Sequence, residues 1–180
     1  GLDVIGIDKK YPIDHPEHGD ILDQSLLTSL KETVQGVVHL GAISRVIDGE
    51  KYPDLCWKTN VDGTGNIIEM GKASSIKPWI IYASSREVYG QQPSLPVKES
   101  DPLSPVNLYG ESKRKGEELI LNASKNGLVT AILRFSNVFG SVQDHPDRVI
   151  PAFCKAAATG TSIRIDGREN VFDFTCLEDV

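Results

Sequence analysis

The sequence lacks the features that mark three kinds of protein. It has only three cysteines, far apart in the chain, and their spacing matches no metal site (Cys56, Cys154 and Cys176). No apolar run reaches the roughly 18–20 residues that cross a membrane. Basic residues are too few for a general nucleic-acid binder, because 19 Lys and Arg face 25 Asp and Glu and the formal net charge is −6. We therefore expect no metal, membrane or nucleic-acid partner, and buried thiols in a reducing, cytoplasmic compartment.

The remaining composition is globular, with 39% hydrophobic and 24% charged residues among 180. This length is enough for one domain with a sizeable core and short for two. The chain begins with Gly1 rather than Met and carries no signal peptide, so it need not begin where its gene begins.

Short apolar runs alternate with longer amphipathic stretches along the chain. The runs predict buried strands at 2–8, 36–40, 79–83, 129–134 and 162–165. The stretches predict helices at 25–33, 53–73, 108–125 and 149–158, the third with a polar side at Glu117, Glu118 and Lys125. Continuous apolar strands separated by helices indicate a parallel sheet covered on both faces. We predict an α/β fold, a doubly wound parallel sheet that binds ligands beyond the carboxyl ends of its strands.

A tyrosine and a lysine stand four residues apart in the predicted helix 108–125, so Tyr109 and Lys113 share one face. A free phenol has a pKa near ~10, and a nearby ammonium favours its ionised form. Lowering that pKa by about 3 units takes roughly 4 kcal/mol. A phenolate so formed could remove a proton from a sugar hydroxyl. The alternative is a surface tyrosine with an unrelated lysine one turn on, and the spacing alone favours that alternative.

Polar residues also follow two of the predicted strands. Ser84 and Ser85 come directly after the run 79–83, where a hydroxyl can bind the substrate oxygen that Tyr109 attacks. Turn chemistry or helix capping is the alternative for two serines at a strand end. Asp8 ends the first run, where a carboxylate accepts both ribose hydroxyls of an adenosine and repels a 2′-phosphate. An ordinary loop acid is the alternative there.

With these residues the chain resembles the extended short-chain dehydrogenase/reductase family, specifically its NAD-dependent nucleotide-sugar epimerases and dehydratases. Matching segments follow one another in order over almost the whole chain, and their order and separation are more specific than any one of them. They are the run ending in Asp8 and the segments 19–23, 39–42, 60–64, 84–90, 109–113, 134–140 and 173–180.

The resemblance implies NAD as cofactor and a nucleotide-diphosphate sugar as substrate. Tyr109 would be the base, Lys113 would hold the nicotinamide ribose and lower the phenol pKa, and Ser85 would orient the substrate hydroxyl. Glu87 stands where decarboxylases and dehydratases of the family carry an acid/base group, and Asn137 matches a contact to the substrate diphosphate. The implied cofactor-binding residues are Asp8, Asp20, Ile21, Leu40, Gly41, Ala42, Ser84, Tyr109 and Lys113. Asn60 is interpreted as a structural polar anchor.

The chain departs from the family pattern at both ends. The family opens with a strand and a Gly-rich turn whose backbone amides hold the pyrophosphate, and neither occurs before Leu2. We therefore expect an NAD-binding Rossmann-like domain over 1–160 that lacks its first strand and Gly-rich turn. Only the beginning of a substrate-binding lobe is expected over 161–180. Phe172 replaces a basic residue of the family, often a phosphate ligand.

The resemblance favours a 4-epimerase similar to UDP-glucose 4-epimerase, which oxidises the sugar at C4 and reduces it again after turning it over. A UDP-uronate decarboxylase and an NDP-sugar 4,6-dehydratase are alternatives. Dehydratases want Asp before the acid/base group, whereas Arg86 precedes Glu87 here. A non-catalytic remnant or binding module is an alternative of a different class. The resemblance also implies a homodimer formed through the stretches 53–73 and 108–125.

Overall fold

The computed structural model describes all residues, 1–180, as two compact units, Gly1–Arg134 and Phe135–Val180. The helices are α1 (Gln24–Leu30), α2 (Val46–Lys51), α3 (Pro53–Trp57), a π-helical turn (Lys58–Asp62), α4 (Gly63–Ala73), α5 (Leu108–Lys125) and α6 (Val149–Thr159). The strands are β1 (Gly36–His39), β2 (Trp79–Ser85), β3 (Thr130–Phe135), β4 (Asn137–Phe139) and β5 (Phe174–Cys176). The assignment of 1–160 to NAD binding stays a prediction.

The first unit is built on a sheet with the strand order β1-β2-β3. β1 and β2 are parallel, with Gly36 opposite Trp79 and His39 opposite Tyr82. Parallel pairing needs a long crossover, which the chain between β1 and β2 supplies as helices. The predicted α/β fold with a parallel sheet is confirmed.

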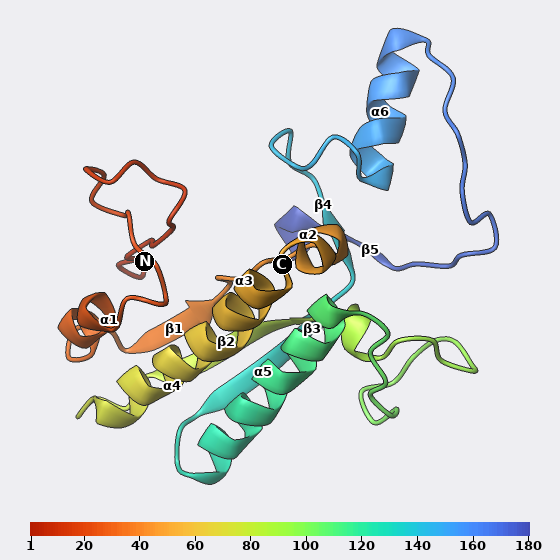
Figure 1. The fold of residues 1–180 in the computed structure, drawn as a ribbon. Helices are drawn as coiled ribbons and strands as arrows, with labels where there is room; N and C mark the ends of the chain where they lie inside the picture. The colour runs from red at the N-terminus through yellow and green to blue at the C-terminus, as the bar shows by residue number, and fades with distance from the viewer. The chain divides into compact units, whose positions relative to one another are not determined.

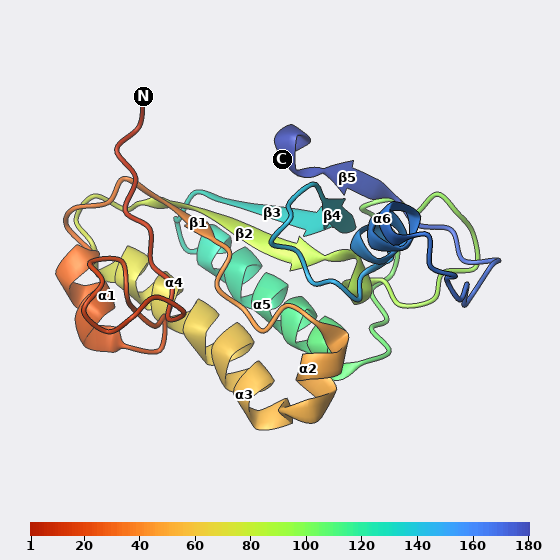
Figure 2. The ribbon, with the colours of Figure 1, turned by 90° about the horizontal axis from the view of Figure 1, so that it is seen from above.

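Helices α4 and α5 lie side by side against one face of this sheet (Figures 1 and 2). The core between the layers consists of Leu27, Ile67, Ile68, Met70, Ile80, Tyr82, Ile120, Ala123 and Leu128. Alternate strand residues point the other way, so Val38 and Leu133 are exposed while their neighbours Val37 and Ile132 pack against the core. This arrangement fixes which side of β2 faces α5.

The predicted helix 53–73 is present as a continuous rod of α3, the π-helical turn and α4 (Figure 1). Pro53 occupies the first helical turn, where its missing N–H costs nothing. Predicted helix 108–125 coincides with α5, because Asn107 caps its first turn and Asn126 and Gly127 follow its end. The predictions of α1, α6, β1, β2 and β3 are also confirmed, within two residues at most ends.

Two predicted strands are wrong. Residues 2–8 form no strand, and Leu2 and Val4 are exposed. A strand needs a neighbour for its N–H and C=O groups, and none of the strands of these 180 residues lies beside this segment. Residues 162–165 also form no strand, and Arg164 pairs in the open with Asp166 instead.

The second unit contains one strand, β4, that the sequence did not predict. β4 and β5 form a two-stranded parallel sheet, in which Asn137 lies opposite Phe174 and Phe139 lies opposite Cys176. Its helix α6 carries Cys154, which is exposed, whereas Cys56 of the first unit is buried. The prediction of three buried thiols is therefore wrong for Cys154. No helix in residues 1–180 combines the length and the apolar character that a membrane span requires.

Candidate active site

Helix α5 carries Tyr109 and Lys113 in its first two turns. The helix starts where it does because the Asn107 side chain accepts a hydrogen bond from the Gly110 N–H at 2.8 Å. Both Tyr109 and Lys113 are buried. The Lys113 ammonium donates a hydrogen bond of 2.8 Å to the Ala83 carbonyl, which ties α5 to the end of β2.

Ser85 lies at the carboxyl end of β2 and is buried. Its hydroxyl accepts a hydrogen bond from the Glu87 N–H at 3.2 Å, which caps the short 3₁₀ turn that follows. The same hydroxyl lies near the Tyr109 phenol and lowers the pKa of that phenol. Ser85 and Tyr109 are thus neighbours, and Lys113 is bound to the same strand end two residues before Ser85. The fold brings these three predicted site residues together.

The pKa of the phenol moves opposite to the direction we expected. Burial raises the pKa of Tyr109 most, Ser85 lowers it through a hydrogen bond, and Glu87 and Cys56 raise it through their charges while Arg86 lowers it. Burial also lowers the pKa of Lys113 to about 8. Desolvation outweighs the help that neighbouring groups give to the phenolate, so the protein's own groups keep Tyr109 protonated at neutral pH.

Glu87 is held by two donors on the rim of the site. One carboxylate oxygen is paired with Arg86 at 2.9 Å, and the other accepts a hydrogen bond of 2.8 Å from the Asn107 side chain. Glu87 therefore fastens the 3₁₀ turn to the first turn of α5.

The segment that follows β1 is anchored from within the helical layer. Asn60 is buried in the π-helical turn, accepts a hydrogen bond from the Ile43 N–H (2.8 Å) and donates to the Ile43 carbonyl (3.1 Å). It also donates to the Ser112 hydroxyl at 2.8 Å. The interpretation of Asn60 as a structural polar anchor is confirmed. Leu40 and Gly41 are left exposed beyond the end of β1, and Ala42 is half-buried.

Of the remaining predicted cofactor residues of the first unit, Ile21 lies near Gly41. The Ile21 side chain lies between Gly41 and Gly63, close enough that a Cβ on either glycine would touch it. The Asp20 carboxylate accepts the Leu22 N–H and pairs with Lys9 at 3.4 Å.

Asp8 does not end a strand, contrary to its prediction. It is exposed, and its carboxylate accepts the Lys10 N–H in a local turn. Asn137 belongs to β4 in the second unit, where its N–H donates to the Asp173 carbonyl at 3.3 Å. Residues 1–180 contain no group of three His, Cys, Asp or Glu side chains arranged to hold a metal ion.

The sequence analysis missed two charged residues beside the site. Glu117, which we expected on the polar side of α5, is 1% exposed and paired with Arg134 of β3. Ser84, predicted to touch the cofactor, donates its hydroxyl hydrogen to Glu117. One signal could have revealed Glu117, because it lies four residues after Lys113 and eight after Tyr109, on the same helix face.

A parallel sheet with helices packed on it is characteristic of a Rossmann-type fold, and Ser85, Tyr109 and Lys113 lie at the carboxyl end of its middle strand. The sequence profile of the NAD dependent epimerase/dehydratase family matches residues 1–180. The chain belongs to that family.

Individual relatives agree with this assignment. The UDP-glucose 4-epimerase of Lacticaseibacillus casei is 32% identical, over 90% of this chain and 54% of its own length. A mutant UDP-glucuronic acid 4-epimerase from Bacillus cereus, solved with a fluorinated UDP-sugar and NAD, superposes with a TM-score of 0.80 and 29% identity, over 89% of this chain and 51% of its own.

A dTDP-glucose 4,6-dehydratase is also similar. The double mutant from Streptomyces venezuelae, solved with NAD bound, gives a TM-score of 0.81 and 28% identity over 90% of this chain and 50% of its own. The chain thus spans about half the length of the relatives it matches.

Proposed function

We propose that this chain carries the catalytic residues of an NAD-dependent nucleotide-sugar 4-epimerase. The single observation behind the proposal is that Ser85 and Tyr109, both buried, are neighbours at the end of β2, with Lys113 bound to the same strand end. The epimerases among the relatives support the substrate class, a nucleotide-diphosphate sugar. UDP-glucose is the sugar nucleotide named for several of them.

The residues present fit NAD. Leu40 and Gly41, which are both exposed, follow β1 at the carboxyl edge of the sheet, and Gly41 lies beside the Ile21 side chain. Asp8, Asp20 and Ala42 complete the proposed cofactor contacts. The Ala83 carbonyl accepts one of the three N–H donors of Lys113, which leaves the ammonium able to bind a ribose hydroxyl. When bound, NAD supplies the hydride acceptor and donor for the sugar carbon.

Tyr109 is the base in this proposal. Its phenolate takes the proton of the C4 hydroxyl and becomes the neutral phenol, and the neighbouring Ser85 hydroxyl orients the C4 hydroxyl. Asn137 of the second unit is the proposed contact to the substrate diphosphate.

Glu87 separates the epimerase from its alternatives. A 4,6-dehydratase or a UDP-uronate decarboxylase would use Glu87 as an acid/base group. Arg86 and Asn107 bind both of its oxygens, which favours a role in fastening the turn over a role as the acid/base group. Product mass decides the matter, because a decarboxylase releases carbon dioxide, a dehydratase releases water and a 4-epimerase leaves the mass unchanged.

A thermal-shift assay with NAD separates an enzyme from a non-catalytic remnant. A ligand at 100 times its dissociation constant adds about 2.7 kcal/mol to the free energy of unfolding. We expect NAD to raise the melting temperature of both the wild type and Tyr109→Phe. Only the wild type should interconvert the C4 epimers of a UDP-sugar. A Tyr109→Phe variant with wild-type turnover would refute the assignment of the base.

We propose a homodimer and a cytoplasmic location as well. Leu55 and Trp57 of α3 and Leu121 of α5 are exposed on the two stretches that the resemblance assigns to the dimer. All three cysteines are free, which agrees with a reducing compartment. Light scattering coupled to size-exclusion chromatography tests the dimer, and a monomer at micromolar concentration would contradict it.

A further inference from the structure

Glu117 is a buried carboxylate on the same face of α5 as the proposed catalytic pair. It lies one turn beyond Lys113 and two turns beyond Tyr109, and its side chain is 2% exposed. A carboxylate is almost never buried without a partner, because desolvation of the charge is costly. Its surroundings must therefore supply hydrogen bonds and an opposite charge.

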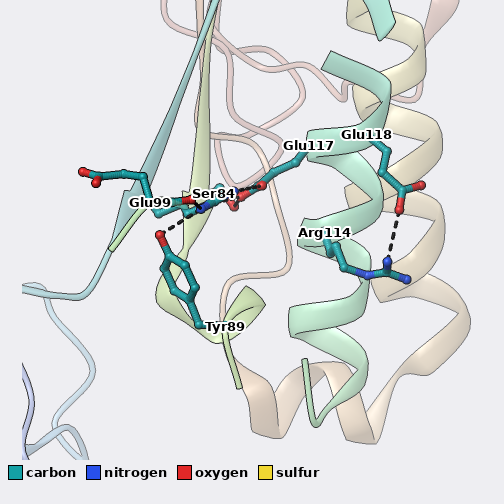
Figure 3. A network of polar contacts seen from close by, with 7 residues as sticks. Ser84, Tyr89, Glu99, Arg114, Glu117 and Glu118 are labelled. Carbon is teal, nitrogen blue, oxygen red and sulfur yellow. Dashed lines mark hydrogen bonds and ion pairs between the residues drawn. The ribbon is translucent and has the colours of Figure 1, made fainter. Parts of the chain in front are cut away.

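Arg134 of β3 supplies both with two parallel contacts. Its Nε donates to Glu117 Oε1 at 2.9 Å, and its Nη2 donates to Oε2 at 2.7 Å. The Ser84 hydroxyl donates a third hydrogen bond to Oε1, at 2.5 Å (Figure 3). The Glu117 carboxylate thus connects α5 to β3 and to the end of β2.

The other edge of the Arg134 guanidinium holds the chain that follows β2. Its Nη1 donates to the Tyr89 hydroxyl at 2.8 Å and to the Glu99 carbonyl at 3.1 Å (Figure 3). The guanidinium carbon also lies 4.9 Å from the centre of the Tyr89 ring. The segment between Ser84 and Glu99, which contains Ser85 and Glu87, is therefore fastened at both ends to one ion pair.

On the basis of the proposed function, we infer that Glu117 and Arg134 are a positioning pair that fixes the Ser85 hydroxyl against Tyr109. Ser84 shares the helix-facing side of β2 with Ile80 and Tyr82, so its bond to Glu117 sets the rotation of the strand end. That rotation determines where the next residue, Ser85, presents its hydroxyl. A bidentate pair is suited to this task because it fixes direction as well as distance.

An exposed ion pair on the same helix provides matched controls. Arg114 Nη1 lies 3.3 Å from Glu118 Oε1 (Figure 3). Both side chains are nearly half exposed. The test compares Ser84→Ala, Glu117→Gln and Arg134→Lys with Glu118→Gln and Arg114→Met. Arg134→Lys keeps the charge but loses the fork that binds both oxygens.

The first measurement does not depend on catalysis. Hydrogen exchange is followed at the Glu87 amide, which donates to the Ser85 hydroxyl, and at amides of α4 as the reference. We expect Ser84→Ala and Glu117→Gln to speed exchange at Glu87 at least tenfold relative to α4, and Glu118→Gln to leave it within twofold. Ser84→Ala removes a single oxygen, so the exchange rate of the Glu87 amide in this variant tests the inference even if Glu117→Gln does not fold.

The second measurement is the split between kcat and KM for a UDP-sugar with NAD. We expect Ser84→Ala and Arg134→Lys to lower kcat at least tenfold and to change KM less than threefold, while both control variants retain wild-type values. Uniform acceleration of all amides, or an unchanged kcat in folded Ser84→Ala and Arg134→Lys, overturns the inference. A wild type without turnover would refute the proposed function, and the exchange at Glu87 would still decide the positioning role.

Discussion

Helix α5 packs tightly against Tyr82 of β2 at Gly116, and this contact can be tested by adding one methyl group. A Cβ at this position would lie 2.2 Å from the Tyr82 hydroxyl oxygen and 2.7 Å from the carbon that bears it. Tyr82 is 1% exposed in the centre of the core, so its ring cannot move without displacing neighbours. We therefore expect Gly116→Ala to push α5 away from β2.

The magnitude follows from two opposing effects. Alanine favours a helix interior over glycine by about 1 kcal/mol. Overpacking a core costs roughly 1–3 kcal/mol, and a separation of 2.2 Å places this site at the upper end. The free energy of unfolding should therefore fall by about 2 kcal/mol. Gly65→Ala in α4 is the matched control, because a Cβ there meets nothing within 4 Å, and it should gain about 1 kcal/mol.

Urea unfolding of the 180-residue chain measures both variants against the wild type. Tyr82→Phe removes the atom that a Gly116 methyl would meet first, so the cost of Gly116→Ala should be smaller in the Tyr82→Phe background. If Gly116→Ala were as stabilising as Gly65→Ala, α5 would not lie this close to β2. The close packing that places Lys113 and Tyr109 at the end of β2 would then be contradicted.

Three further predictions concern buried ionisable groups. Burial lowers the pKa of His39 to about 3. The free energy of unfolding of the wild type, measured with urea, should therefore fall by about 3 kcal/mol between pH 7 and 4, and His39→Gln should not show this loss. Burial lowers the pKa of Lys113 to about 8, so above that pH the unfolded chain binds more protons than the folded chain. The free energy of unfolding of the wild type should therefore rise by about 2 kcal/mol from pH 7 to 10, and that of Lys113→Met should not. Arg134→Met leaves Glu117 buried without its partner and should cost about 3–5 kcal/mol, whereas Arg114→Met should cost less than about 1 kcal/mol. An equal cost for the two arginine variants would contradict the burial of Glu117.

Elements with their own local signals could be predicted from the sequence. α5 has a capping asparagine, an apolar stripe and a glycine after its end, and its predicted bounds match the structure. The serine, tyrosine and lysine of the site could be predicted because each belongs to such an element. Their meeting follows from the rule that parallel strands present their carboxyl ends at one edge.

Features that depend on a distant partner could not be predicted. Residues 2–8 have the apolar character of a strand, but pairing decides whether a strand forms, and no strand of these 180 residues lies beside them. Glu117 looks like a surface residue of α5 until Arg134, 17 residues later in the chain, is brought against it by β3. The rise in the pKa of Tyr109 likewise results from burial, which the four-residue spacing to Lys113 does not reveal.

This opposite movement of the two pKa values bears on how a base could work here. Burial raises the pKa of Tyr109 and lowers that of Lys113, so the protein's own groups hold the phenol in its protonated form. Bringing a phenol from its usual pKa near 10 to neutrality takes roughly 4 kcal/mol of added stabilisation of the phenolate, and more from a raised starting value. Arg86 is the one cationic side chain that lowers the pKa of Tyr109, and burial outweighs it. The further positive charge that the proposed chemistry requires must come from the bound ligand, and the oxidised nicotinamide ring of NAD carries one. Tyr109 would then become a base only in the complex, so proton removal would be confined to the state in which a hydride acceptor is present.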